Sequence, residues 1–163
     1  MLACATERGI SKLEFTDTKH IQDDLNTLSK CYQTKIIHQL NDDLIALQQQ
    51  LKEYFDGSRK EFTIPLDVTG TEFQIKAWQY LQTITFGHTI TYSDQARDLN
   101  KELAIRALAH ANGCNKIAIL IPCHRVLGKN GKLTGYRWGL NRKRKLILHE
   151  QQFSELKSTL FSE

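Results

Sequence analysis

The sequence predicts an α/β fold, with a small N-terminal α/β domain followed by a mostly helical domain that contains a helix-turn-helix. Two observations carry this prediction: the chain opens with two alternating apolar segments, and short helices with capping residues dominate after residue 70. The 163 residues suit one medium domain or two small ones that share a core. We place the boundary within residues 65–70, which gives domains of residues 1–68 and 69–163.

The first domain should begin with a β-hairpin. Residues 2–6 and 10–15 alternate in polarity on either side of Gly9, which is typical of two strands joined by a turn. A helix is predicted at about residues 18–28, and a short strand at residues 34–37. The hairpin would place a sheet at the start of the domain.

A firmer helix should follow in the same domain. It begins after Asn41, a good N-cap residue followed by two aspartates, and ends at Gly57. Its apolar residues recur at helical spacing and predict one buried face: Leu44, Leu47, Leu51 and Tyr54. We expect packing against the core to be the whole role of this helix.

The second domain should open with a capped helix. An extended stretch at residues 62–68 leads to Thr71 and Gln74, which form a capping-box pattern. This pattern predicts a helix over residues 73–81.

A helix-turn-helix is predicted next. Residues 91–99 and 101–112 have helical patterns, with a turn around Asn100 and a stop at Gly113. On a helical wheel the second helix buries one face and turns Arg106 the other way. The buried face is formed by Ala104, Leu108 and Ala111, and the residues around the arginine are Glu102, Ala109 and Gly113. Small neighbours would let a nucleic acid approach closely, although an ordinary surface arginine on a helical hairpin is an equal alternative.

The charge is distributed unevenly. Residues 1–56 hold nine acids against six bases, whereas residues 116–145 hold nine bases and no acid, within a net charge of +4. The basic residues are Lys116, Arg125, Lys129, Lys132, Arg137, Arg142, Lys143, Arg144 and Lys145. A polyanion is the obvious partner, and a solvated basic face is the alternative.

The composition excludes several classes of protein. No stretch approaches the roughly 18 apolar residues of a membrane span, and the start lacks the pattern of a signal peptide, so we expect a cytoplasmic protein with no membrane contact. The four cysteines lack the spacing of a zinc site and the density of a disulfide scaffold. We therefore expect free thiols and no metal, with Cys4 and Cys31 inert.

The chemistry is expected at the segment IAILIPCHRV, residues 117–126. An apolar strand-like stretch stops at a proline and delivers Cys123, His124 and Arg125, which could emerge at the wall of a cavity. A cysteine is only a few per cent thiolate at neutral pH, so it needs a base or positive surroundings. His124 can take the proton, Arg125 can favour the anion, and Glu150 could fix the imidazole tautomer. Neighbours in an extended chain point apart, so the relay should use a bend or a bridging water.

The segment IPCHRV resembles the active-site signature of the methylated-DNA-protein-cysteine methyltransferases, also called O6-alkylguanine-DNA alkyltransferases. Further family positions fall at matching distances: Tyr92, Arg106, Asn115, Tyr136 and Glu150. The resemblance covers residues 69–150 strongly and the N-terminal half loosely. It implies a ribonuclease-H-like first domain and a winged helix-turn-helix-like second domain that carries the active site.

The resemblance also implies roles for the residues of the site. Cys123 would be the acceptor thiol, His124 its water-mediated base and Glu150 the residue that orients His124. Asn115 matches a hinge asparagine that ties the helix-turn-helix to the active-site turn. Tyr92 matches a tyrosine that turns the phosphate of the target nucleotide and is the nearest candidate donor to the departing guanine.

DNA binding is implied in the same way. Arg106 matches an arginine that enters the duplex in place of the extruded base, and the second helix would lie in the minor groove, with Ala107, Tyr92 and Arg125 also against DNA. O6 of guanine is buried in the base stack, so the base must be flipped out at a cost of a few kcal/mol. An inserted side chain and phosphate contacts offset that cost.

The segment TGYRWG would form part of the guanine pocket. Tyr136 resembles a pocket-wall tyrosine, and Arg137 and Trp138 stand where many relatives carry a small residue followed by glycine, a pattern similar to adaptive-response members of the family. A bulky Trp138 should narrow the pocket. We therefore expect good reaction with methylated guanine and poor reaction with a benzyl-sized adduct.

The implied reaction is a direct displacement on the alkyl carbon that yields a stable thioether. Each molecule would act once, as a monomer on double-stranded DNA containing O6-alkylguanine, with no cofactor. Three alternatives remain: a transcriptional regulator, a lesion-binding alkyltransferase-like protein without repair activity, and a cysteine hydrolase with turnover.

Overall fold

The structure is a computed structural model that describes residues 1–18 and 21–154. Its chain begins with the predicted hairpin. Strands β1 (Leu2–Thr6) and β2 (Gly9–Glu14) pair antiparallel. Gly9 has a φ of 132°, and a Cβ there would lie 2.2 Å from the carbonyl oxygen of Pro65. Only glycine therefore fits this turn, where the hairpin meets the connection to the second domain.

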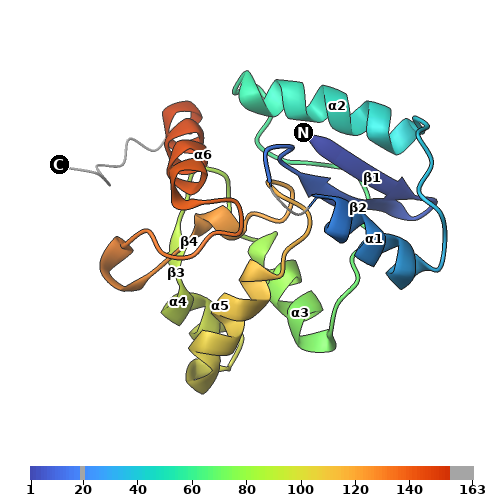
Figure 1. The fold of residues 1–163 in the computed structure, drawn as a ribbon. Coiled ribbons are helices and arrows are strands. Elements are labelled where there is room, and N and C mark those ends of the chain that lie inside the picture. The colour runs from blue at the N-terminus through green and yellow to red at the C-terminus, as the bar shows by residue number, and fades with distance from the viewer. Residues whose placement is uncertain (19–20, 155–163) are drawn as a thin grey trace.

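Helices α1 (Ile21–Tyr32) and α2 (Asp42–Phe55) complete the first domain, and α2 runs along the hairpin (Figure 1). The predicted cap of α2 is confirmed, because the Asn41 side chain accepts from the backbone N–H of Leu44 at 2.9 Å. The strand predicted at residues 34–37 is wrong. These residues have no regular structure and are exposed, so no buried face holds them to a sheet.

The two domains are joined through β2. Near the start of β2, Ile10 donates to Pro65 O at 2.8 Å and accepts from Asp67 N at 2.9 Å, both within the first domain. Near the end of β2, Leu13 donates to Lys116 O at 3.0 Å and accepts from Ala118 N at 2.9 Å, both in the second domain. The first domain therefore supports the loop that leads to Cys123.

The second domain contains the predicted helix-turn-helix, shown below the hairpin in Figure 1. The domain opens with α3 (Glu72–Leu81). The helix-turn-helix that follows consists of α4 (Tyr92–Asp98), the 3-10 turn η1 (Glu102–Ala104) and α5 (Ile105–Gly113). The capping box of Thr71 and Gln74 is confirmed, and Asn100 takes a positive φ of 53° at the turn. Leu108 and Ala111 are buried and Arg106 is exposed, as the helical wheel predicts.

The apolar run before Cys123 is a buried turn and not the expected strand. Only Ile117 makes a bridge, to Leu13, and Ile119 takes a positive φ of 70°. The chain then forms the 3-10 turn η2 (Cys123–Arg125) and the short strand β4 (Val126–Leu127), which pairs parallel with β3 (Ile90–Thr91). Apolar composition correctly indicated burial here but not backbone conformation.

The chain closes with the 3-10 turn η3 (Lys129–Gly131), a loop, and helix α6 (Leu140–Phe153). One apolar core spans both domains, with Leu13, Leu47 and Tyr54 from the first and Trp78 and Ile121 from the second. No helix within residues 1–18 and 21–154 combines the length and apolar character needed to cross a bilayer.

Candidate active site

The Cys123 thiol is held at the start of η2 by the side chain of Asn115. The amide Nδ2 of Asn115 donates to Sγ of Cys123 at 3.3 Å and to Ile121 O at 2.9 Å, while its Oδ1 accepts from Ile117 N at 2.9 Å. Asn115 is fully buried. One side chain thus fixes both ends of the buried turn and stabilises negative charge on the sulfur.

Glu150 on α6 binds four residues from three parts of the chain. Its Oε1 lies 2.7 Å from His124 Nε2 and accepts from Tyr54 Oη at 2.9 Å and from Arg125 Nη2 at 3.0 Å. Its Oε2 accepts from Gly87 N at 3.1 Å and from Arg125 Nε at 2.9 Å. Burial alone would raise the pKa of Glu150, but His124 and Arg125 lower it well below its usual range, so this carboxylate is charged.

The charged carboxylate fixes the tautomer of His124. Nε2 must carry the proton that it donates to Glu150, which leaves Nδ1 unprotonated. Nδ1 is buried and has no hydrogen-bond partner among the described residues. Burial lowers the pKa of His124 even though Glu150 opposes it, so the ring is neutral and Nδ1 can accept a proton.

The thiol itself is protonated at rest. Burial raises the pKa of Cys123 to about 11, while the hydrogen bond from Asn115 and the charge of Lys143 act to lower it. A neutral thiol beside a neutral imidazole is protected from stray electrophiles, since only the thiolate is strongly nucleophilic. The thiolate must therefore form during the reaction.

Lys143 is a site residue that the sequence did not reveal. We expected it within a basic surface, but it is fully buried on α6, and its Nζ donates to Thr134 O at 2.7 Å and to Gly135 O at 3.1 Å. Burial lowers its pKa to about 8, against the opposing influence of Cys123. Helical spacing offered a signal, because Lys143 shares its buried face with Leu146, Ile147 and Glu150.

Arg125 is not where we expected it. Its side chain is buried, donates to Glu150 through two nitrogens and to Ile84 O through the third. The charge of the Arg125 guanidinium is thus neutralised by Glu150. The buried position of Arg125 supports neither the predicted contact with DNA nor direct stabilisation of the Cys123 thiolate. The prediction that α2 only packs against the core is also wrong. Tyr54 on α2 donates a hydrogen bond to Glu150.

The tyrosines expected at the pocket lie near the thiol. Burial raises the pKa of Tyr92 to about 12, with a further contribution from Cys123, and the Lys143 ammonium lies 5.9 Å from the Tyr92 ring centroid. Burial raises the pKa of Tyr136, with a further contribution from Cys123, and its buried hydroxyl has no hydrogen-bond partner within the described part of the chain. Trp138 packs edge-on against Tyr136, with ring centroids 5.2 Å apart.

The Cys123 thiol is almost covered by its surroundings. Cys123 is 5% exposed, and a neighbouring hollow of about 330 Å³ is lined by Pro122 and Arg125 but not by Cys123. A flipped guanine must therefore approach the sulfur through a small exposed area.

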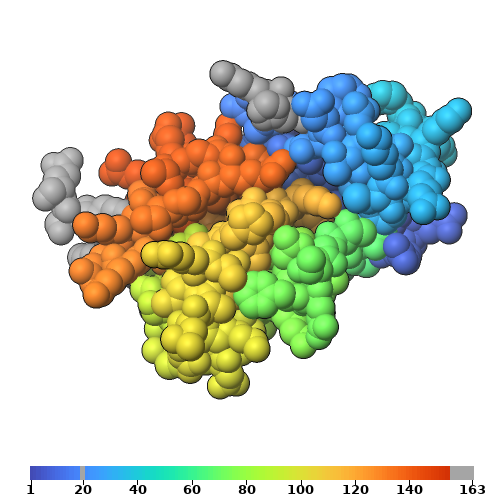
Figure 2. Space-filling model, turned by 60° about the horizontal axis from the view of Figure 1, so that its bottom comes forward, coloured from blue at the N-terminus to red at the C-terminus, as the bar shows by residue number. Residues whose placement is uncertain are grey.

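The predicted DNA-facing residues Arg106 and Ala107 are exposed at the start of α5. They share a face with the exposed Leu103 and His110, at spacings of three and four residues. Figure 2 shows this yellow segment projecting from the body of the molecule beside α3. The exposed face combines one arginine with an alanine and a fully exposed leucine.

Comparisons with known proteins match both domains to one family. The ribonuclease-like domain of 6-O-methylguanine DNA methyltransferase matches residues 1–68, and the DNA binding domain of the same family matches residues 72–152. The inducible methylated-DNA–protein-cysteine methyltransferase of Bacillus subtilis is 39% identical over 139 residues, which cover 85% of this chain and 78% of the relative. The enzyme of Mycolicibacterium paratuberculosis is 49% identical over 113 residues, which cover 69% of this chain and 68% of the relative.

A solved structure gives the same result. The crystal structure of Mycobacterium tuberculosis OGT in complex with DNA matches with a TM-score of 0.76 and 34% identity, over 93% of this chain and 86% of that one. Sequence, domain order and fold therefore agree, and the chain belongs to the 6-O-methylguanine DNA methyltransferase family.

Proposed function

We propose that this protein repairs O6-alkylguanine in double-stranded DNA by transferring the alkyl group irreversibly to Cys123. The observation that carries the proposal is the buried arrangement of the Cys123 thiol, the neutral His124 and the charged Glu150 inside a chain of this family. The relatives named above are methylated-DNA–protein-cysteine methyltransferases, and one neighbouring structure holds DNA. The reaction needs neither a metal nor a cofactor.

The proton leaves Cys123 through a bridging water and arrives at Nδ1 of His124. Glu150 stabilises the imidazolium that results, because the Nε2 proton already points at its carboxylate. The thiolate, stabilised by Asn115 and Lys143, attacks the alkyl carbon, so that a C–S bond forms as the bond to O6 breaks. The departing guanine takes the displaced electron pair, and Tyr92 is the candidate donor to it.

The DNA-binding face consists of Arg106, Ala107 and their exposed neighbours on α5, together with Tyr92. We place this face in the minor groove, with Arg106 filling the gap left by the flipped base. Ala107 supports this arrangement because its small side chain permits close approach, and Leu103 adds apolar surface of the kind that wedges base steps apart.

Arg106→Ala should slow repair of duplex DNA by about tenfold or more, because the cost of unstacking, a few kcal/mol, is no longer offset. Reaction with the free base O6-methylguanine should be unchanged, since no base is flipped. Single-turnover rate constants on both substrates measure this, with Lys52→Ala, an exposed cation on α2 of the first domain, as the control. An equal loss on both substrates would show that Arg106 acts on the site and not on the duplex.

The test of the function is stoichiometry. The amount of guanine restored in an excess of duplex containing O6-methylguanine should reach one equivalent per chain and then stop. Continued turnover would indicate a cysteine hydrolase, and binding without restored guanine would indicate a regulator or a lesion-binding relative. Either result would contradict the proposal.

We further propose that the protein acts as a monomer in the cytoplasm, with residues 1–68 and 69–163 as its two domains. The irregular connection at residues 58–71 and the two separate family matches support this division.

A further inference from the structure

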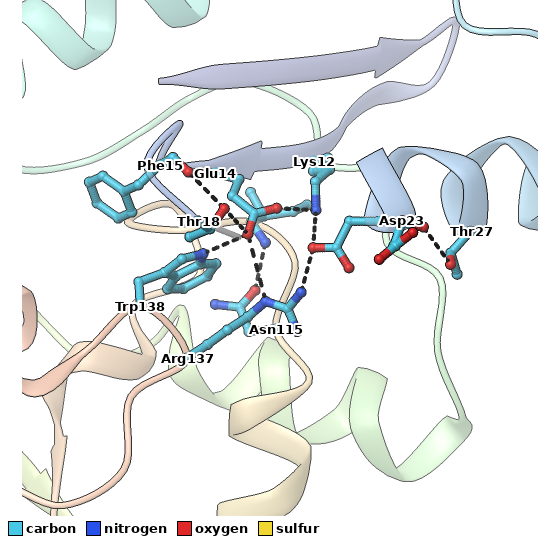
Figure 3. A network of polar contacts seen from close by, with 11 residues as sticks. Lys12, Glu14, Phe15, Thr18, Asp23, Thr27, Asn115, Arg137 and Trp138 are labelled. Carbon is cyan, nitrogen blue, oxygen red and sulfur yellow. Dashed lines mark hydrogen bonds and ion pairs between the residues drawn. The ribbon is translucent and has the colours of Figure 1, made fainter. Parts of the chain in front are cut away.

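The loop between η3 and α6 carries Tyr136. The next two residues, Arg137 and Trp138, attach this loop to the first domain (Figure 3). Arg137 donates to Asp24 Oδ2 at 2.6 Å, and Trp138 Nε1 donates to Glu14 Oε1 at 3.2 Å. Both acceptors lie more than 110 residues away in sequence. The loop that carries Tyr136 is thus held by side chains of the first domain.

The two acceptors, Glu14 and Asp24, are also held by contacts within the first domain. Lys12 is 2% exposed, forms an ion pair with Glu14 and donates to Asp24 at 3.2 Å, while Thr18 donates to Glu14 at 3.2 Å (Figure 3). A buried ion pair carries a large desolvation cost and is weak support for stability alone. Glu14 and Asp24 also bind Trp138 and Arg137, which indicates a role in positioning the loop that carries Tyr136.

Trp138 links this network to the pocket. Its ring packs edge-on between Phe15, at 6.1 Å, and Tyr136, at 5.2 Å between centroids. The indole is buried and bound to Glu14, so it cannot turn away without breaking that hydrogen bond. The position of Tyr136 therefore depends on Glu14 through Trp138.

We propose that Glu14 and Asp24 are specificity-determining positioning residues, which hold the Tyr136 loop close to Cys123 and so restrict the protein to small alkyl groups. This inference rests on the proposed function and assigns the ribonuclease-like domain a part in selecting the lesion. It also adds to the expected role of Trp138, which would limit the pocket by fixing Tyr136 as well as by its own bulk.

The test compares rate constants for duplexes containing O6-methylguanine and O6-benzylguanine. Asp24→Asn weakens the contact with Arg137 and should raise the benzyl-to-methyl ratio about tenfold, the scale on which pocket contacts discriminate, while the methyl rate stays within about threefold. Glu14→Gln should act in the same direction. Arg137→Gln should have only a small additional effect in an Asp24→Asn background, because the one remaining ion pair of Arg137, with Glu14, spans 4.0 Å and is weaker than the contact with Asp24 at 2.6 Å.

The matched control is Glu53→Gln, which removes another ion pair of the first domain, with Arg59 at 2.6 Å, away from the loop. It should leave the ratio unchanged. Asp24 is partly exposed, so its variant tests the proposal even if Glu14→Gln does not fold. If the wild-type protein transfers methyl but the Asp24→Asn ratio equals the wild-type ratio, the inference fails and the proposed function stands. If the wild-type protein transfers no methyl group, both fail.

Discussion

Glu150→Gln should lower the free energy of unfolding by about 3–5 kcal/mol, because it leaves the buried Arg125 without a counter-charge. The same change should slow alkyl transfer, since a glutamine cannot stabilise the imidazolium of His124. Urea unfolding at neutral pH and single-turnover kinetics measure the two effects. Glu102→Gln, which removes an exposed carboxylate on η1, is the control and should change neither by much.

The pH dependence of stability provides a second check on Glu150. Its pKa in the folded protein lies below the ordinary carboxyl value of about 4.3. The stabilisation from Glu150 is therefore fully present above that value and is lost as the pH falls from it toward the folded pKa. Wild type should lose more stability than Glu150→Gln over this acidic range. Parallel curves for the two proteins would contradict the assignment of a charged, paired Glu150.

His124→Gln should slow alkyl transfer by about 10²- to 10⁴-fold, the range typical of a lost general base. DNA affinity should be unchanged, because His124 is fully buried and does not reach the surface. Burial lowers its pKa, so the ring stays neutral at pH values where an ordinary histidine begins to protonate. The wild-type transfer rate should accordingly show no loss from histidine protonation between about pH 7 and 6.5.

The control for this prediction is His88→Gln, which replaces an exposed histidine. Single-turnover rates and equilibrium binding to an unmodified duplex separate the chemical step from DNA affinity. A His124→Gln protein that reacts at the wild-type rate would show that Cys123 loses its proton by another route.

Local signals in the sequence predicted much of the fold. The hairpin around Gly9, the cap at Asn41 and the capping box at Thr71 each depend on residues within a few positions of one another, and all three are confirmed. The apolar run at residues 117–121 was misjudged because the side chain of Asn115 supplies hydrogen bonds that a neighbouring strand would otherwise provide. Apolar composition alone does not distinguish a buried turn from a buried strand.

The parts of the site that escaped prediction depend on contacts between distant residues. Tyr54 meets Glu150 across 96 positions, and Glu14 meets Trp138 across 124. Arg125 and Lys143 were grouped with surface bases because sequence shows their charge but not the groups that surround them. A motif could suggest the cysteine, histidine and glutamate, whereas only the packed domains reveal what holds them.

The intact mass of the protein after incubation with a duplex containing O6-methylguanine tests the central claim most directly. The mass should rise by a single methyl group, peptide mapping should place that group on Cys123, and Cys123→Ala should show no increase. An unchanged wild-type mass, or a methyl group on Cys4, Cys31 or Cys114, would contradict the account.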